Sequence, residues 1–248
     1  MLLLQGLFAF SMLQPIADFA RDVGYPATPY GFVFMCSDLI YQMIIMGGAI
    51  WLFCNAPFQD QLYPYLLARS GRRSWTTGNL FYIWATSFFY LLYLFVISIL
   101  PFLFNLSWSA EWGKIWTTLA KTNVGGDYAI SVLISDQIRS RFTPLQAVGA
   151  SIALEWLCAS LLGTLIYVGN RFFERPVGLW VAAFFVFYDI TIYNMLSNWH
   201  YTYSPVSLAR LTTTMGDSNV SLSYAFIFLI LANVLSAFLA YTVDRRAK

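Results

Sequence analysis

Long uninterrupted apolar runs restrict the fold of this chain more than any other feature of its sequence. A helix needs about 20 residues to cross the ~30 Å hydrocarbon core of a bilayer. Five runs reach about that length, at residues 32–53, 80–104, 147–168, 177–196 and 222–243. Because these runs are continuous rather than alternating, they predict helices and not the strands of a membrane barrel.

A sixth run, at residues 2–20, is less apolar than the other five. Gln5, Gln14, Pro15 and Asp18 interrupt it, and it is too long for the apolar core of a signal peptide. We predict a short first transmembrane helix here. The whole chain, residues 1–248, is then one all-α polytopic membrane domain of about six transmembrane helices.

The composition agrees with lipid as the main solvent of the chain. Of its residues 59% are hydrophobic and 10% are charged, whereas an average soluble domain has roughly 45–50% and 25%. There are too few charged side chains to build a water-facing surface. The 9 Trp and 16 Tyr residues suit the boundary between lipid and water, where an amphipathic ring contacts both.

Three functional classes find no support in the sequence. The formal net charge is +2 and no block of Lys and Arg with interleaved aromatic residues occurs, which argues against a nucleic-acid partner. Cys36, Cys54 and Cys158 lie in or at the edge of apolar runs, and with the single His200 they give no metal-ligand spacing. Phosphate-binding loops and hydrolase motifs are absent. We predict a non-catalytic chain with no cofactor or metal of its own.

The basic residues of the short loops predict the orientation. If there are six spans, one side of the membrane carries Arg69, Arg72, Arg73, Arg171, Arg175, Arg245, Arg246 and Lys248. Lys and Arg favour the cytoplasmic side of a membrane protein, so this side and both termini are predicted to be cytoplasmic. The opposite side carries Arg21, Arg210, Lys114, Lys121, Arg139 and Arg141, but the last four belong to a long segment, which counts less.

That long outer segment, residues 105–146, contains two amphipathic stretches. Trp108, Trp112 and Trp116 recur at four-residue spacing, and a second stretch runs from Tyr128 to Phe142. We predict an amphipathic segment lying along the outer membrane surface. The alternative is an ordinary surface loop.

The segment at residues 55–79 carries the most informative pattern. A Leu/Tyr-rich stretch precedes Arg-x-Gly-Arg-Arg-x-Trp, and the pattern positions are Tyr65, Leu66, Leu67, Arg69, Gly71, Arg72, Arg73, Trp75 and Gly78. The segment resembles the one before the third span in permease subunits of bacterial ATP-binding-cassette exporters of the type-two class. The stretch Tyr203–Leu211 resembles the Pro-centred outer re-entrant segment of that family, which we place at residues 197–221. The chain departs from the family in starting at its first span, without a preceding amphipathic helix.

The resemblance implies a membrane subunit in the bacterial plasma membrane that pairs with an identical or paralogous second copy. A separate ATPase would bind ATP and Mg²⁺, which this chain is not expected to bind. The coupling residues would be Leu62, Tyr65, Leu66, Leu67, Arg69, Arg72, Arg73 and Trp75. Their leucines would face a groove on the ATPase, and their arginines would meet acidic groups or lipid phosphates. The alternative is that these arginines only mark the cytoplasmic face.

Three carboxylates fall inside the predicted spans. Asp38, Glu155 and Asp189 would each cost ~2.5–3.5 kcal/mol there if charged and exposed to lipid. We therefore expect them to face the bundle interior, where they could line a translocation path, attract a cationic cargo or couple protons. The alternative is that Asn194, Tyr188 or Tyr193 bonds to them between helices.

These observations predict the membrane subunit of an ATP-driven exporter for a hydrophobic or amphipathic cargo, such as a membrane-active peptide, a lipid or a drug. The main alternative is a secondary transporter driven by an ion gradient through Glu155 or Asp189, which would need no ATPase. Such carriers often contain inverted repeats, and none is visible in this sequence. A membrane scaffold would need a binding domain that the short loops do not supply.

Overall fold

The computed structural model of the chain describes residues 1–59, 63–215 and 220–246. Within these ranges the regular structure is helical and contains no strand. The helices, with the 3₁₀ helices marked η, are α1 (Leu2–Asp22), α2 (Gly31–Ser37), α3 (Leu39–Phe53), α4 (Tyr63–Ile99), η1 (Leu100–Asn105), α5 (Gly113–Lys121), η2 (Asn123–Gly126), α6 (Asp136–Arg141), α7 (Pro144–Phe173), α8 (Val177–Met195), η3 (Asn198–Tyr203), α9 (Pro205–Ala209), η4 (Leu211–Thr214) and α10 (Leu222–Arg246).

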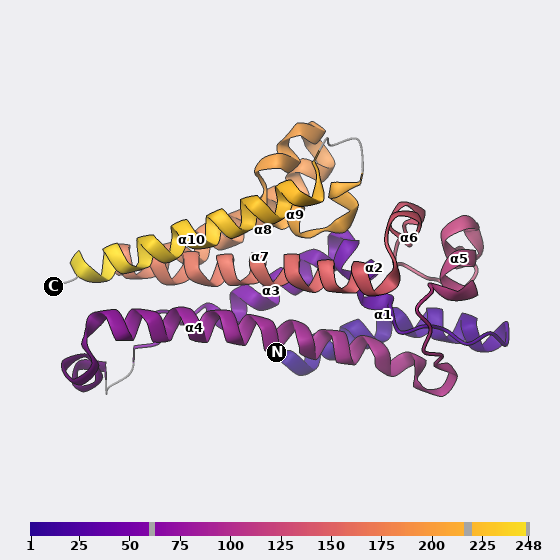
Figure 1. Ribbon diagram of the computed structural model, residues 1–248, viewed down its shortest axis with the longest axis horizontal. Coiled ribbons are helices and arrows are strands. Elements are labelled where there is room, and N and C mark those ends of the chain that lie inside the picture. Colours follow the sequence, from indigo (N-terminus) through magenta and orange to yellow (C-terminus); the bar gives the residue numbers. More distant parts are fainter. Residues whose placement is uncertain (60–62, 216–219, 247–248) are drawn as a thin grey trace.

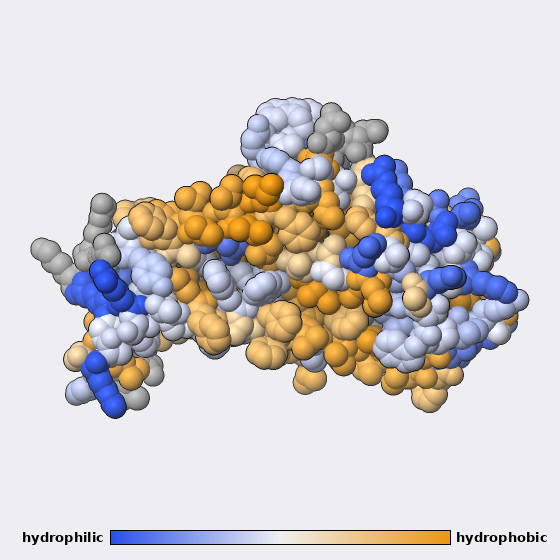
Figure 2. All heavy atoms as spheres, in the orientation of Figure 1, coloured by the Kyte–Doolittle hydropathy of each residue, from blue (hydrophilic) through white to orange (hydrophobic). Residues whose placement is uncertain are grey.

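The long helices lie roughly along one axis and form a bundle (Figure 1). Five of them, α1, α4, α7, α8 and α10, are long and apolar enough to cross a membrane, and the bent pair α2 and α3 makes a sixth span if counted as one. Hydrophobic side chains cover the middle of the visible face, and hydrophilic ones gather toward its two ends (Figure 2). The prediction of an all-α polytopic membrane protein is confirmed.

The second predicted span, at residues 32–53, is broken rather than continuous. Helices α2 and α3 meet at an angle of 88°. Asp38, between them, has extended backbone dihedrals, and its carboxylate accepts hydrogen bonds from the main-chain N–H groups of Ile40 at 2.9 Å and Tyr41 at 3.4 Å. The prediction that Asp38 lies inside a helix is therefore wrong, because its side chain caps the start of α3.

The third span starts earlier than predicted. Helix α4 begins at Tyr63 and takes in much of the predicted 55–79 loop. At Gly71 the backbone has φ of 76° and ψ of 160°, a conformation that only glycine adopts without strain. Gly71 thus separates a short helix, residues 63–70, from the long membrane helix, residues 72–99. At one end of the bundle the short helix turns away from the long one (Figure 1).

Helix α7 lies at the centre of the bundle and packs against α3, α4, α8 and α10. Thr143 and Gln146 fix its start with reciprocal bonds between side chain and main chain, which satisfy amide groups that the first turn leaves unpaired. At its other end Gly169 meets Gly178 of α8 so closely that a Cβ on either residue would enter the backbone of the other helix. Because neither glycine carries a side chain, the two helix backbones can approach each other closely at this point.

The outer segment at residues 105–146 folds into a collar whose buried side chains join the core of the bundle. Trp116 is fully buried, and its indole N–H donates to the Thr28 carbonyl at 3.0 Å. The indole N–H of Trp112 donates to the Phe142 carbonyl at 2.9 Å. The four-residue spacing of the tryptophans does not mark one helix, since α5 begins at Gly113 and Trp108 lies in a non-helical stretch.

The second stretch of this segment also differs from its prediction. Between Tyr128 and Phe142 only Asp136–Arg141 is helical. The collar is tied to the loop after α1 by two main-chain bonds, from the Ala27 N–H to the Asn105 carbonyl at 2.9 Å and from the Ser107 N–H to the Ala27 carbonyl at 3.0 Å. These tertiary contacts hold the segment against the bundle, and its place along the outer membrane surface stays a prediction.

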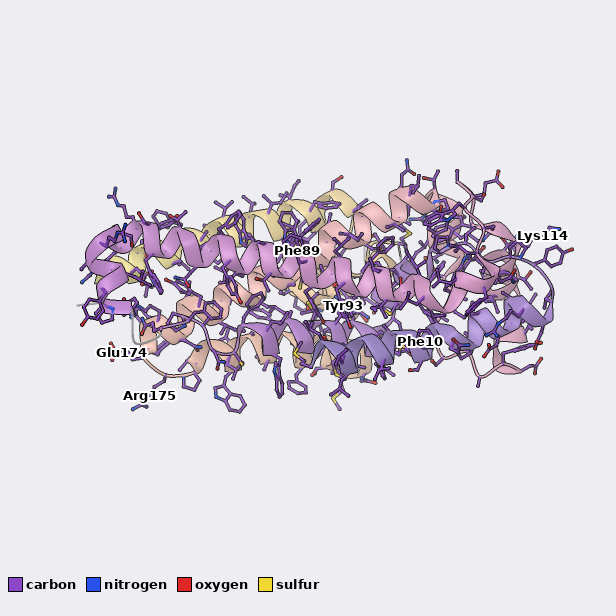
Figure 3. The ribbon with its side chains drawn as sticks, turned by 90° about the horizontal axis from the view of Figure 1, so that it is seen from below. Phe10, Phe89, Tyr93, Lys114, Glu174 and Arg175 are labelled. Carbon is purple, nitrogen blue, oxygen red and sulfur yellow. The ribbon has the colours of Figure 1, made fainter. Side chains whose placement is uncertain are left out.

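The amino-terminal part of α1 lies beside the middle of α4. Tyr93 of α4 donates from its hydroxyl to the Leu2 carbonyl at 3.0 Å, and the Gln5 amide donates to the Ile44 carbonyl of α3 at 3.0 Å. Phe10 of α1 lies further along the bundle than Tyr93 (Figure 3). The carboxyl-terminal end of α10 lies at the end of the bundle (Figure 1). The side of the membrane on which each terminus lies stays a prediction.

The contact between α7 and α8 gives a stability prediction. A Cβ at Gly178 would lie 2.7 Å from the Ile166 Cα, and neither backbone can move without separating the helices. We expect Gly178→Ala to lower the free energy of unfolding by about 3 kcal/mol, at the upper end of the usual overpacking cost. Thermal unfolding of the purified chain in detergent measures it.

Gly149→Ala is the matched control, because Gly149 lies on the same α7 with open space around its Cβ position. It should leave the stability unchanged or raise it by up to ~1 kcal/mol, since alanine favours helix. Equal melting temperatures for the two variants would contradict the close packing of α7 against α8.

Candidate functional site

Most of the arginines that predicted the cytoplasmic side lie at one end of the bundle. This end is formed by the start of α4, the α7–α8 turn and the end of α10 (Figure 1). Glu174 and Arg175 of the turn lie at the opposite end of the molecule from Lys114 of the collar (Figure 3). We refer to the first end as the basic end.

The short helix at residues 63–70 carries the predicted coupling residues at the basic end. Tyr65 is 76% exposed and Leu66 is 43% exposed, whereas Leu67 is half-buried. Arg69 is exposed, and so are Arg72 and Arg73 beyond the Gly71 break. Leu62 lies outside the described residues. Four of the eight predicted coupling residues therefore lie on the short helix, and Arg72 and Arg73 follow directly after it.

Trp75 differs from the other coupling residues because it faces inward. It is half-buried, and its ring meets the Tyr63 ring edge to face at a centroid distance of 5.1 Å. The Tyr63 hydroxyl accepts a hydrogen bond from the Arg171 guanidinium at 2.8 Å. Tyr63 and Trp75 thus connect the short helix to α7, and Trp75 holds the element in place rather than presenting a docking face.

Asp244 of α10 joins three membrane helices beneath the short helix. Its carboxylate is buried and accepts hydrogen bonds from Thr76 of α4 at 2.6 Å, Tyr167 of α7 at 2.5 Å and Arg171 of α7 at 2.9 Å. Arg72 donates to the Asp244 main-chain carbonyl at 3.4 Å. Because Arg171 also binds Tyr63, one chain of polar contacts runs from the short helix into α4, α7 and α10.

Sequence reasoning missed Asp244, Arg171 and Tyr63 as site residues. Asp244 directly follows the last apolar run and reads as the start of the charged tail, and Arg171 reads as a loop charge. One signal in the sequence could have identified Asp244. It lies within one turn of an apolar run, and a carboxylate that close to the membrane interior needs a partner.

A hollow of about 460 Å³ lies beside this network. It is lined by Ala56, Pro57, Gln59, Asn170, Arg171, Glu174, Arg175 and Pro176. Asn170 holds its walls together, because its amide donates to the Ala56 carbonyl and accepts from the Gly178 N–H, both at 2.9 Å. The hollow and the short helix both belong to the basic end, so this end offers a cavity and a projection.

Deep in the bundle, Asp189 of α8 forms a buried ion pair with Arg210. The guanidinium lies 2.6 Å from the carboxylate, and the Ser207 hydroxyl donates to the same oxygen. Ser207 and Arg210 belong to α9 and the residue after it, inside the predicted re-entrant segment at residues 197–221. Residues 216–219 of that segment lie outside the described residues. The segment's short helices η3, α9 and η4 are consistent with an irregular insertion.

The partners found for Asp189 are Arg210 and Ser207. They differ from Asn194, Tyr188 and Tyr193, which the sequence offered as alternatives. The Asn194 amide donates to the Ile190 carbonyl of its own helix at 2.8 Å. Arg210, which the sequence presented as an outer loop charge, supplies the partner instead. Tertiary folding of the re-entrant segment therefore satisfies this carboxylate, as a buried charge requires.

Glu155 of α7 is fully buried, and neither of its carboxylate oxygens has a hydrogen-bond partner among the described residues. Asp38 is separate from it and lines an outer cavity of about 260 Å³. Arg210 also lines that cavity, together with Tyr193, Tyr201 and others. Of the three predicted path residues, Asp38 and the partner of Asp189 thus border one cavity. Glu155 does not line this cavity, and its oxygens have no hydrogen-bond partner among the described residues.

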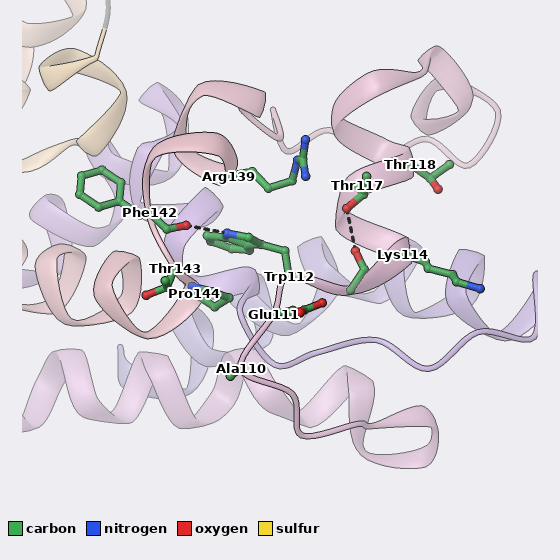
Figure 4. Close-up of a pocket in the computed structure, with 11 residues that line it drawn as sticks. Ala110, Glu111, Trp112, Lys114, Thr117, Thr118, Arg139, Phe142, Thr143 and Pro144 are labelled. Carbon is green, nitrogen blue, oxygen red and sulfur yellow. Dashed lines mark hydrogen bonds between the residues drawn. The ribbon is translucent and has the colours of Figure 1, made fainter.

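A larger hollow of about 570 Å³ occurs in the collar, bordered by Trp112, Lys114, Arg139 and Phe142 (Figure 4). Its polar groups are largely occupied, since Arg139 pairs with Asp136 at 2.6 Å and the Trp112 indole with the Phe142 carbonyl. We assign it a structural role in the collar.

In comparisons with known proteins, no family model, curated protein or solved structure matches the chain. The described residues contain no group of His, Cys, Asp and Glu that could hold a metal ion. What the helices define is a multi-pass membrane protein. The family resemblance and the exporter function stay predictions.

The Asp244 network gives a prediction about the basic end. Asp244→Ala leaves Arg171, Tyr167 and Thr76 without their common acceptor, and the loss of one partner of a buried ion pair typically costs about 3 kcal/mol. We expect that loss in thermal unfolding, together with faster proteolysis near residues 63–70, because Tyr63 loses its support.

Asp136→Ala is the control, since it breaks an ion pair between the same residue types in which the carboxylate is exposed. Exposed pairs contribute less than ~1 kcal/mol. If the two variants lose equal stability, or if residues near 63–70 are cleaved no faster in Asp244→Ala, the network does not hold the short helix.

Proposed function

We propose that this chain is the membrane subunit of an ATP-driven exporter in a bacterial plasma membrane. The observation that carries the proposal is the projecting helix at residues 63–70. It exposes Tyr65 and Leu66 beside three arginines at the basic end, and Arg171 and Asp244 link it to three membrane helices. Because the short helix is exposed and linked to these membrane helices, a partner that binds it can move them.

A separate nucleotide-binding ATPase fits this element best. Burying apolar side chains in a partner's groove releases about 25 cal/mol per Å², and a short helix docks by laying its apolar face into such a groove. Arg69, Arg72 and Arg73 would then favour an acidic rim. The ATPase would hold ATP and Mg²⁺, and this chain would carry out no chemistry.

Closure of the ATPase around ATP would move the short helix as a rigid body. Arg171 and Asp244 would pass that displacement to α4, α7 and α10 together, because their contacts bind all three. Such a movement can alternate a bundle between inward-facing and outward-facing arrangements. A second copy of the chain, identical or paralogous, would complete the path.

A hydrophobic or amphipathic cargo suits the lining available in this chain. The bundle exposes large aromatic and aliphatic side chains along its length, and its few buried charges leave little affinity for a strongly polar solute. A membrane-active peptide, a lipid or a drug has the required character.

An ion-gradient-driven secondary transporter is the second candidate, and two observations favour it. Helices α2 and α3 are broken at Asp38, as in carriers that bind ions at interrupted helices, and Glu155 is buried without a hydrogen-bond partner among the described residues. Uptake into inverted vesicles separates the two candidates. Transport that runs on a gradient without ATP, and stops in Glu155→Gln, would favour the carrier.

The exporter proposal predicts a specific complex. Tagged chain purified from its own membranes in mild detergent should bring down a nucleotide-binding subunit and Mg²⁺-dependent ATP hydrolysis. Leu66→Asp should lower both by ~10-fold or more, because a charge in an apolar groove costs more than the 1.4 kcal/mol that corresponds to tenfold.

Leu133→Asp is the matched control, because Leu133 is 70% exposed and lies in the outer collar. It should retain the subunit. Wild-type eluates without any nucleotide-binding subunit would overturn the proposal, and so would equal recovery with Leu66→Asp and with wild type.

A further inference from the structure

The interior around Glu155 contains several polar atoms that lack partners. Both carboxylate oxygens of Glu155, the Oε1 of Gln42 and the Oγ of Ser151 make no hydrogen bond with the described residues. Glu155 and Gln42 are fully buried, and Ser151 is 1% exposed. Buried polar atoms in proteins are almost always bonded, so a cluster of unbonded ones indicates a missing partner.

The three side chains are placed to share one partner. Ser151 and Glu155 lie one turn apart on α7 and therefore point to the same face of the helix. Gln42 belongs to α3, which packs against α7, and its amide faces the Glu155 carboxylate. The Gln42 amide nitrogen donates one of its two N–H groups to the Val206 carbonyl at 3.4 Å, and the Gln42 Oε1 has no hydrogen-bond partner among the described residues.

The charge of this region is unbalanced. Its buried charged side chains are Glu155, Asp189 and Arg210, which give two negative charges and one positive. The guanidinium of Arg210 is bonded to Asp189, and its charge also acts on Glu155, so the two carboxylates share one cation. The other titratable groups that face it are Cys36 of α2, Tyr90 of α4 and Cys158 of α7, none of which carries positive charge.

Most of the atoms without hydrogen-bond partners are acceptors, so the missing partner must supply a donated hydrogen or a positive charge. Four oxygens require either donated hydrogens or a positive charge, and a buried carboxylate without either is strongly disfavoured. Oxygen ligands of this kind suit hard cations.

We propose that Glu155, Gln42 and Ser151 form a binding site for one small positive charge, either a proton or a monovalent metal ion. A proton taken from solvent would convert the Glu155 carboxylate to the acid, and its O–H would donate to the Gln42 Oε1. A metal ion would be coordinated by the carboxylate, the Gln42 Oε1 and the Ser151 Oγ. The site goes beyond the exporter proposal, since it does not depend on which energy source drives transport.

Thermal unfolding of the purified chain in detergent tests the site without any ATPase. In choline buffer, the melting temperature of wild type should fall by ~3 °C or more as the pH is raised from about 5 toward alkaline values, because over that range the unfolded chain has released the Glu155 proton that the folded chain still holds. Glu155→Gln should lack this decrease, since the amide is neutral at every pH. At neutral pH, replacing choline by Na⁺ or K⁺ tests for a metal ion.

Glu174→Gln is the matched control, because Glu174 is an exposed glutamate at the end of the same helix (Figure 3). It should follow wild type in every buffer. A response to pH alone identifies the proton, and a rise of the wild-type melting temperature with Na⁺ or K⁺ that Glu155→Gln lacks identifies a metal ion.

Gln42→Met covers the case in which Glu155→Gln does not fold. It removes one polar side chain of the site and should weaken the ion response or change the pH range over which the melting temperature falls. Parallel pH and ion responses in wild type and Glu155→Gln would overturn the proposal, and so would an unchanged response in Gln42→Met. Either result leaves the ATPase pull-down, and thus the exporter proposal, unaffected.

Discussion

The absence of water inside the bilayer is the constraint on which the rest of this structure depends. A polar group in the hydrocarbon core must find its partner within the protein. The chain satisfies Asp189 with Arg210 and Ser207 of an inserted segment, and it satisfies Asp244 with three donors from two neighbouring helices. These bonds fix where the irregular segments lie, and they leave Glu155 as the buried carboxylate whose partner is not supplied by the described residues.

Helix α7 connects the two regions that we regard as functional. It carries Glu155 near its middle and Arg171 near its end, and close contact with α8 at Gly169 and Gly178 makes the pair a firm unit. A displacement of the short helix at residues 63–70 would therefore reach α7 through Arg171. If the exporter and ion-site proposals both hold, α7 is the element through which a cytoplasmic partner and the buried site would influence each other.

Hydropathy predicted the helical membrane fold because burial in lipid depends on local composition. Hydropathy could not predict the break at Asp38, where a single carboxylate caps a new helix inside an apolar run. The aspartate after Ser37 was a visible signal, because such residues commonly begin helices. The tryptophan spacing did not predict that α5 begins only at Gly113, so that Trp116 lies in the helix and Trp108 and Trp112 lie before it. The coupling pattern located the exposed helix, but the partners Tyr63, Arg171 and Asp244 depend on contacts between residues more than 70 positions apart.

The sidedness of the basic end tests the account most directly, since an ATPase can reach the short helix only from the cytoplasm. Single cysteines at Arg69, Arg175 and Lys114, in a chain whose three native cysteines are replaced, can be treated with a membrane-impermeant thiol reagent in intact cells. The account predicts that the Lys114 position reacts, and that the Arg69 and Arg175 positions react only after the membrane is permeabilised. Reaction of the Arg69 position in intact cells would contradict it.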